Sequence, residues 1–173
     1  CYIDSEQWWK VGDIVSTIKV DTIQTRAGAV PKPTDLGLNV SGHVIQTVVN
    51  TATTNVSTTS TTAQDLISAS ITPLFTDSTI HVEGFISRLE VIFNSNAFAS
   101  MYLVDPAGTA FTTGVSGNAS NTNSSPATVF GTHSPNSTSS QTYKLMFSTA
   151  SSGTTSTSTD SQRYSIILRE IRA

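Results

Sequence analysis

The 173-residue sequence contains little charge. Charged residues make up 12% of the chain, about half of the share that is usual in soluble domains. Nine basic residues form no cluster and are outnumbered by twelve acidic ones, which argues against nucleic-acid binding, because phosphates need a basic footprint. The single cysteine, Cys1, allows no internal disulfide. An apolar run of membrane-spanning length and a signal peptide are also lacking, so we expect no membrane insertion and no export by its own N-terminus.

Serine and threonine take the place of the missing charge. The sequence has 26 serines and 28 threonines, so hydroxyl groups rather than charges keep its surface hydrated. Threonine is β-branched and favours the extended backbone of a strand. Lysine and glutamate, which are common in surface helices, are scarce. The composition therefore favours strands and loops over helices.

Residues 1–42 differ from the rest of the chain and predict an N-terminal arm and linker. They hold most of the lysines, both tryptophans and a stretch punctuated by proline and glycine. Within them we expect a short strand at residues 14–20. Trp8 and Trp9 act either as an anchor into a neighbouring protein or as a local core, and the short chain around them favours the anchor. We expect a separate head domain at residues 43–173.

From His43 onward, apolar and polar residues alternate with a period of two, which is the pattern of β-strands. The predicted strands are His43–Asn50, Asp65–Ile71, Thr79–Phe93, Phe98–Val104, Pro126–His133, Gln141–Ser148 and Gln162–Ile171. Several short strands separated by turn-rich segments are typical of antiparallel sandwiches and jelly rolls. The sequence therefore predicts an all-β protein: an antiparallel β-sandwich or jelly-roll-like head with an extended N-terminal arm.

The connections between these strands carry their own signals. A shift in the alternation near Gly84 predicts a β-bulge or corner there. Asp105–Gly108 has the composition of a tight turn. Thr113–Ser125 and Thr149–Asp160 are rich in Ser, Thr, Asn and Gly and predict long exposed loops. The threonine-rich segment Thr51–Thr62 is expected to pair at a sheet edge or to make a wide connection.

No group of residues in the sequence predicts catalysis, a metal site or a cofactor site. The histidines His43, His81 and His133 come from separate strands without the short spacing of zinc ligands, so we expect surface or pore-lining positions. Glu83 and Glu90 fall on opposite faces of an unbroken strand, although a shift in alternation could bring them to the same face. The G-x-S-x-G elbow and glycine-rich phosphate loops are absent. We expect a protein that is not an enzyme.

Several segments resemble, in the same order, the tail-fibre-like structural proteins of marine and cyanobacterial phages. Ser16–Val49 (STIKVDTIQTRAGAVPKPTDLGLNVSGHVIQTVV) is similar to the linker and first strand of these proteins. Ser70–Pro73 (SITP), Gln141–Leu145 (QTYKL) and Tyr164–Ile171 (YSIILREI) follow in the expected sequence. The resemblance covers residues 14–173.

The resemblance implies a component of a virus particle that forms homotrimers. Such a protein would attach to other particle proteins through residues 1–42 and present a β-rich head for adsorption to the host surface, with polysaccharide as a candidate receptor. Polar loops on a rigid sandwich suit carbohydrate recognition that gains strength from several copies. A capsid decoration or cement protein, or a head fibre, is the alternative.

Two further classes fit the sequence less well. A depolymerase usually needs a long β-helix with clustered carboxylates, which this short chain does not offer. A carbohydrate-binding module of a secreted enzyme would display planar aromatic side chains, for which Tyr102 and Phe111 are the candidates.

Overall fold

The computed structural model describes residues 41–93, 97–119, 123–149, 153–157 and 163–173. These residues form β-strands and connections without a helix, and they belong to one compact unit. The predicted arm at residues 1–42, with Trp8 and Trp9, lies outside the described residues except for Ser41 and Gly42. Within the described part, no helix could cross a membrane.

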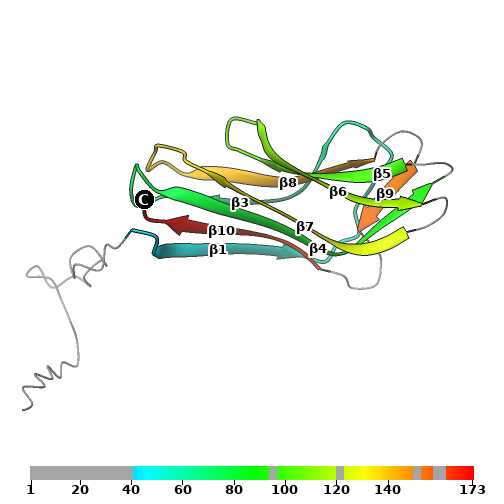
Figure 1. The fold of residues 1–173 in the computed structure, drawn as a ribbon, viewed down its shortest axis with the longest axis horizontal. Helices are drawn as coiled ribbons and strands as arrows, with labels where there is room; N and C mark the ends of the chain where they lie inside the picture. Colours follow the sequence, from blue (N-terminus) through cyan, green and yellow to red (C-terminus); the bar gives the residue numbers. More distant parts are fainter. Residues whose placement is uncertain (1–40, 94–96, 120–122, 150–152, 158–162) are drawn as a thin grey trace, which may run out of the picture. The chain divides into compact units, whose positions relative to one another are not determined.

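Ten strands build two antiparallel sheets (Figure 1). The six-stranded sheet, sheet A, has the order β1-β10-β4-β9-β2. Strand β10 pairs with the first half of β4 and β9 with its second half, while β7 pairs with both halves along the opposite edge of β4. The strands of sheet A are β1 (Val44–Ala52), β2 (Ser57–Thr58), β4 (Thr79–Phe93), β7 (Asn123–His133), β9 (Gly153–Thr157) and β10 (Tyr164–Ile171). The four-stranded sheet, sheet B, has the order β3-β8-β5-β6. Its strands are β3 (Gln64–Ile71), β5 (Ala97–Val104), β6 (Ala110–Ala119) and β8 (Gln141–Thr149).

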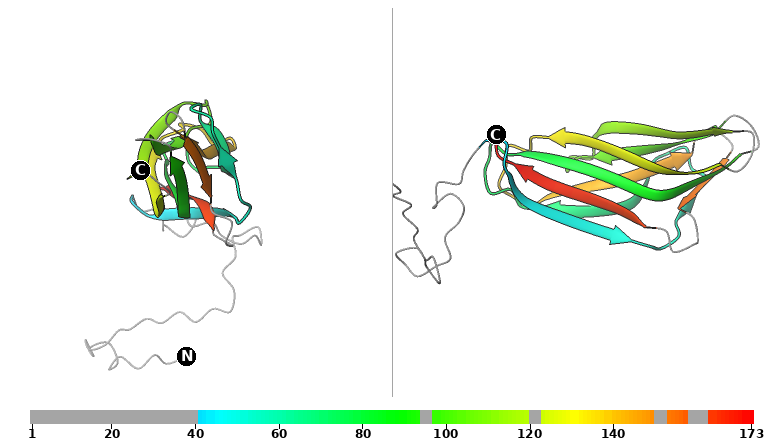
Figure 2. Two further views of the ribbon diagram at one scale, coloured as in Figure 1. Left: turned by 90° about the vertical axis from the view of Figure 1, so that its right-hand side faces the viewer. Right: turned by 60° about the horizontal axis from the view of Figure 1, so that its bottom comes forward.

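The two sheets enclose an apolar core, and their strands run along the length of the unit (Figure 2). Alternation predicts the inward faces of β8 and β10 correctly. Tyr143, Leu145 and Phe147 on β8 are fully buried, as are Ile166 and Leu168 on β10. The predicted all-β class and the antiparallel sandwich are therefore confirmed.

A close approach of the two sheets requires a glycine on β4. A Cβ atom at Gly84 would lie 2.6 Å from Leu145 Cδ1, closer than side-chain atoms pack. The bulge predicted near Gly84 is present in β4 but lies slightly later in the strand, because Gly84 itself pairs regularly with Ile166 and Val129. The pairing with β7 shifts instead between Ile86 and Leu89.

This bulge explains the change in alternation along β4. Ile80 and Val82 precede it, Leu89 and Val91 follow it, and all four side chains are buried in the same core. An extra residue in one strand moves every later side chain to the other face. The bulge therefore keeps both halves of β4 directed into one core, rather than toward opposite sides as the sequence alone suggested.

The two predicted long loops are also wrong. Thr113–Ser125 lies mostly in β6 and β7, and Thr149–Asp160 contains β9. On β9, Thr155 and Thr157 point into the core with at most 1% of their surface exposed. A threonine can occupy a buried strand position because its β-branched side chain suits the extended backbone. Thr51–Thr62 behaves as expected, since β2 within it pairs with β9 at the edge of sheet A.

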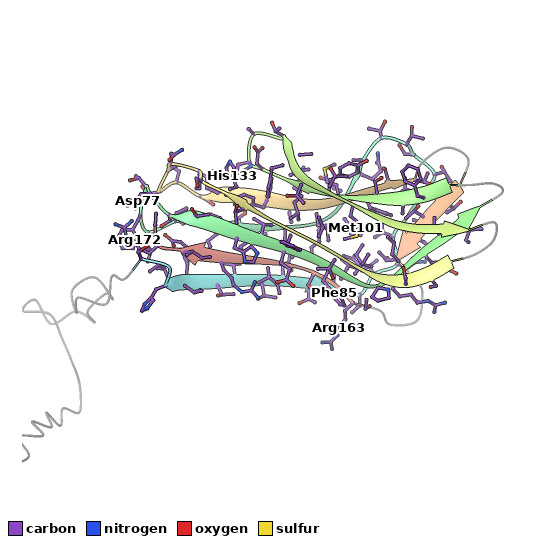
Figure 3. All side chains as sticks on the ribbon, viewed as in Figure 1. Asp77, Phe85, Met101, His133, Arg163 and Arg172 are labelled. Atoms are coloured by element: carbon purple, nitrogen blue, oxygen red, sulfur yellow. The ribbon has the colours of Figure 1, made fainter. Side chains whose placement is uncertain are left out.

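The first described residues meet the last ones at one end of the sandwich. Gly42 N donates a hydrogen bond to Arg172 O (2.8 Å), and Arg172 N donates to His43 O (3.0 Å). The Arg172 guanidinium pairs with Asp77 and lies 4.5 Å from the centre of the Phe75 ring. Figure 3 shows Arg172 and Asp77 together at this end. The start of β1 and the finish of β10 therefore lie at the same end of the sandwich.

Candidate functional site

A polar and aromatic cluster lies where β5, β6, β7 and β8 come together. His133 Nδ1 is 2.9 Å from the Tyr143 hydroxyl, and His133 Nε2 is 3.9 Å from Asp105 Oδ2. The Phe111 ring packs against both, with ring centres 5.9 Å from His133 and 6.3 Å from Tyr143. An Asp–His–hydroxyl series of this kind could activate a nucleophile if the hydroxyl were accessible.

Burial of the tyrosine decides the role of this cluster. Tyr143 has no exposed surface, so a substrate has no access to its hydroxyl. Burial, and secondarily the negative charge of Asp105, raise the pKa of Tyr143 above its ordinary value of 10.0. The phenol therefore remains protonated and forms a hydrogen bond within the fold. We interpret the cluster as structural support for the joint between the two sheets.

His43 and His81 lie on the solvent side, as predicted, whereas His133 is half-buried between aromatic side chains. His81 lies between the buried residues Ile80 and Val82 and faces outward from sheet A, while His43 is exposed before β1. His133 belongs to the cluster above. Among the described residues, no group of three or more His, Cys, Asp and Glu side chains could hold a metal ion.

The two carboxylates of β4 are separated along the strand. Because of the bulge, Glu83 and Glu90 both alternate with buried neighbours and face outward from sheet A. Seven residues of extended chain place them roughly 20 Å apart. Glycosidic cleavage needs two carboxyl groups about 5–9.5 Å apart, and Glu83 instead pairs with Arg169 at 3.0 Å. These two residues do not form such a site.

The outer face of sheet A carries exposed apolar side chains. One cross-strand row contains Val49, Ile167, Glu83 and Phe130, taken from β1, β10, β4 and β7 in that order. Phe130 is 68% exposed and Val49 is 56% exposed. Phe85 lies two residues from Glu83 on the same outward side of β4 (Figure 3). We call this set, with Arg169, the sheet A outer face.

The outer side of sheet B contains a hollow of about 370 Å³ beside the connection between β5 and β6. We call it the β5–β6 hollow. The turn at residues 105–108 forms its wall, and residues of β5 and β8 complete it. The lining residues are Val104, Asp105, Pro106, Ala107, Gly108, Thr142, Lys144 and Met146. The predicted turn is confirmed, since Gly108 N donates to Asp105 O at 3.0 Å and Gly108 has φ of 85°.

The sequence pointed to parts of these surfaces only. Tyr102, predicted as an exposed planar aromatic, is half-buried, and its hydroxyl lies 3.2 Å from Ser148 Oγ. Phe111, the other candidate, packs into the cluster with His133 and Tyr143. The β5–β6 hollow was missed because it combines a turn with a strand more than thirty residues later in the chain. Of its features, only the turn signal at Asp105–Gly108 was visible beforehand.

No protein-family model matches this chain, and no curated protein sequence matches it. The chain is similar to solved structures of infectious bursal disease virus. For the Gt strain, identity is 17% over 75% of this chain and 33% of the other, with a TM-score of 0.38. For the Gx strain, identity is 17% over 74% of this chain and 36% of the other, with a TM-score of 0.33. For a mutant VP2 protein of that virus in derived T=1 particles, identity is 16% over 75% of this chain and 37% of the other, with a TM-score of 0.32.

The chain spans about a third of the length of each of these viral chains. The TM-scores are too low to support a conclusion about fold or function, so the sandwich is established by its own strand pairing.

Proposed function

We propose that this protein is a non-enzymatic structural component of a virus particle. It attaches to the particle through residues 1–42 and presents the β-sandwich as a fibre-type head that takes part in adsorption to the host surface. The ordered resemblance to tail-fibre-like proteins supports the viral assignment. The observation that carries the structural role is the exposed apolar character of the sheet A outer face.

The sheet A outer face has the properties of a surface that packs against protein. Soluble monomers rarely leave large contiguous apolar patches in contact with water. Here Phe130 and Val49 are mostly exposed, and the half-buried Ile167 and Phe85 lie between them in the sheet, beside the ion pair of Glu83 and Arg169. Aromatic and aliphatic anchors surrounded by polar groups are typical of interface centres. We propose that three copies associate through this face.

The position of the chain ends supports attachment at one end of the sandwich. Gly42 and Arg172 are joined by a backbone hydrogen bond of 2.8 Å. A docking arm that enters at Gly42 leaves the far end of the sheets away from the point of attachment. This arrangement suits a head that projects from a particle.

The oligomeric state of the purified full chain tests this proposal. Light scattering coupled to size-exclusion chromatography should give three times the 18.3 kDa mass of one chain. The Phe130→Ser variant should shift the distribution toward the monomer, because it removes the most exposed apolar anchor. Phe98→Ser, which changes a 43% exposed phenylalanine on sheet B, is the matched control and should remain trimeric. A monomeric wild-type chain at micromolar concentration would overturn the trimer.

A capsid decoration or cement protein is the second candidate. The sheet A outer face could pack on capsid subunits in the same way as on further copies of this chain. Deletion of residues 1–42 distinguishes the two roles in reconstituted particles. Loss of particle stability with normal adsorption favours the decoration protein, and loss of adsorption with stable particles favours the fibre head.

A further inference from the structure

The β5–β6 hollow has a wall that is fixed before any ligand arrives. Thr109 N donates to Asp105 Oδ1 at 2.8 Å, and Asp105 N donates to Thr109 O at 2.9 Å. Gly108 N donates to Asp105 O at 3.0 Å, so both the backbone and the side chain of Asp105 hold the turn. A preformed site spends little binding free energy on ordering its own groups.

The lining of the hollow combines apolar surface with the cation of Lys144, which an adjoining carboxylate neutralises. Val104, only 6% exposed, and Met146 contribute apolar surface. Lys144 lines the hollow. Its Nζ donates to Oδ2 of Asp65, a residue of β3 next to the lining, at 2.7 Å. An ammonium group has three donors, so two N–H groups remain after this bond. Both side chains of the pair are accessible, at 43% for Lys144 and 58% for Asp65.

This combination matches the chemistry of a neutral sugar. One sugar hydroxyl can accept a hydrogen bond from Lys144 Nζ while an adjacent hydroxyl donates to the Asp65 carboxylate. The C–H face of the ring can pack on the Met146 side chain. An anionic ligand is less suitable, because Asp65 already neutralises Lys144 and Asp105 lines the same hollow. A volume of about 370 Å³ lies within the range of small-molecule sites.

We propose that the β5–β6 hollow binds one neutral sugar unit of a polysaccharide, with Lys144, Asp65 and Met146 as its recognition residues. This inference rests on the proposed adsorption role and gives it a site and a ligand class. The site lies on strands and a tight turn of sheet B, not in Thr113–Ser125 or Thr149–Asp160, which the sequence predicted as long exposed loops. A single sugar binds weakly at such a site, and several copies on one particle would add avidity.

The two methionines of the chain provide a direct test. Met146 lines the hollow, whereas Met101 lies in the core with 1% of its surface exposed (Figure 3). Full-length protein labelled with ¹³C at the methionine methyl groups should give two signals, assigned with the Met146→Leu variant. Methyl glycosides of glucose, mannose and galactose are titrated up to ~100 mM, since weak single-site binding corresponds to a millimolar Kd. We expect at least one glycoside to shift the Met146 signal in a saturable way and to leave Met101 unchanged.

Variants connect the shift to the proposed contacts. Lys144→Gln should weaken the binding by at least about tenfold, in keeping with the loss of a charged hydrogen bond. Glu90→Gln removes a charge on the opposite sheet, outside the sheet A outer face, and should keep the wild-type Kd. Absence of a Met146 shift with all three glycosides, or an equal shift of Met101, would overturn the site. Tighter binding of glucuronate than of the neutral glycosides would overturn the ligand class. None of these outcomes depends on the trimer, so the two proposals can fail separately.

Discussion

Ser78 Oγ donates a hydrogen bond of 2.6 Å to Glu170 Oε1, and neither residue has any exposed surface. Oε1 also accepts from Leu74 N at 2.8 Å and from Phe75 N at 3.3 Å. Gln46 Nε2 donates to Oε2 at 2.6 Å. One carboxylate on β10 therefore satisfies four donors from the connection between β3 and β4 and from β1. Since β3 belongs to the other sheet, Glu170 joins sheet B to sheet A.

Glu170→Gln should destabilise the protein. The glutamine amide has one acceptor oxygen and places an NH₂ donor opposite groups that are themselves donors. Loss of charged hydrogen bonds with buried donors left unpaired costs about 2–4 kcal/mol of the free energy of unfolding. Urea denaturation measures this change. Glu90→Gln, on the outer face of β4, is the matched control and should change stability by less than about 0.5 kcal/mol. Equal effects of both substitutions would contradict the role of Glu170.

Tyr143 predicts a loss of stability at alkaline pH. Its folded-state pKa is raised above 10.0 by burial and by Asp105, so the stability linked to the neutral phenol is complete below pH 10 and falls as the pH rises above it. The expected slope is at most about 1.4 kcal/mol per pH unit. Tyr143→Phe lowers stability because the hydrogen bond from the Tyr143 hydroxyl to His133 is lost. The variant has no phenol to ionise, so its free energy of unfolding should not show this dependence on pH. The difference between wild type and variant should be constant below pH 9 and should shrink above pH 10. A difference that stays constant to pH 11 would show that Tyr143 does not titrate in this way.

The faces of the long strands could be predicted from alternation. The alternation in Gln162–Ile171 puts Tyr164, Ile166 and Leu168 on one face, and all three are buried. Continuing the same period brings Glu170 to that face, so a signal for a buried carboxylate was present in the sequence. Its partners were not visible, because they come from residues 46 and 74–78, more than ninety positions earlier. Local pattern gives the direction of a side chain, whereas tertiary contacts decide whether a charge can be buried there.

Positions where polar residues replace apolar ones were harder to predict. The alternation of Thr155 and Thr157 with Thr154 and Ser156 carries no contrast in hydrophobicity, so β9 was predicted as part of a loop.

The β5–β6 hollow could not be predicted for a different reason. Its residues meet only because β5 and β8 are neighbours in sheet B, with Val104 opposite Lys144. Strand order and register, which the sequence did not reveal, create this site.

The close approach of Leu145 to Gly84 predicts that alanine substitution destabilises the protein at Gly84 but not at Gly114. Gly84→Ala places a Cβ 2.6 Å from Leu145 Cδ1 and 3.2 Å from Val129 Cγ1. Overpacking of this kind costs about 1–3 kcal/mol. Gly114→Ala is the matched control on β6, because its Cβ would lie at an ordinary 3.5 Å from the Val129 side chain. Thermal unfolding should show a lower Tm for Gly84→Ala and little change for Gly114→Ala. Similar Tm values for the two variants would contradict the close approach of the sheets at Gly84.

Two threonines of β9 allow a comparison between a buried hydroxyl that lacks a hydrogen-bond partner and one that has a partner. Thr155 and Thr157 both face the core, but Thr157 Oγ1 accepts a hydrogen bond from Val56 N at 2.9 Å. Thr155 Oγ1 is buried without a hydrogen-bond partner among the described residues. Valine keeps the β-branched shape and removes only the hydroxyl.

Thr155→Val should therefore raise the free energy of unfolding by about 1 kcal/mol, because the hydroxyl is no longer desolvated without compensation. Thr157→Val should lower it by about 1 kcal/mol, because the half-buried Val56 N–H would lose its acceptor. Urea denaturation of the two variants at one pH gives both signs in the same experiment. Destabilisation by Thr155→Val would contradict the prediction that its buried hydroxyl is uncompensated.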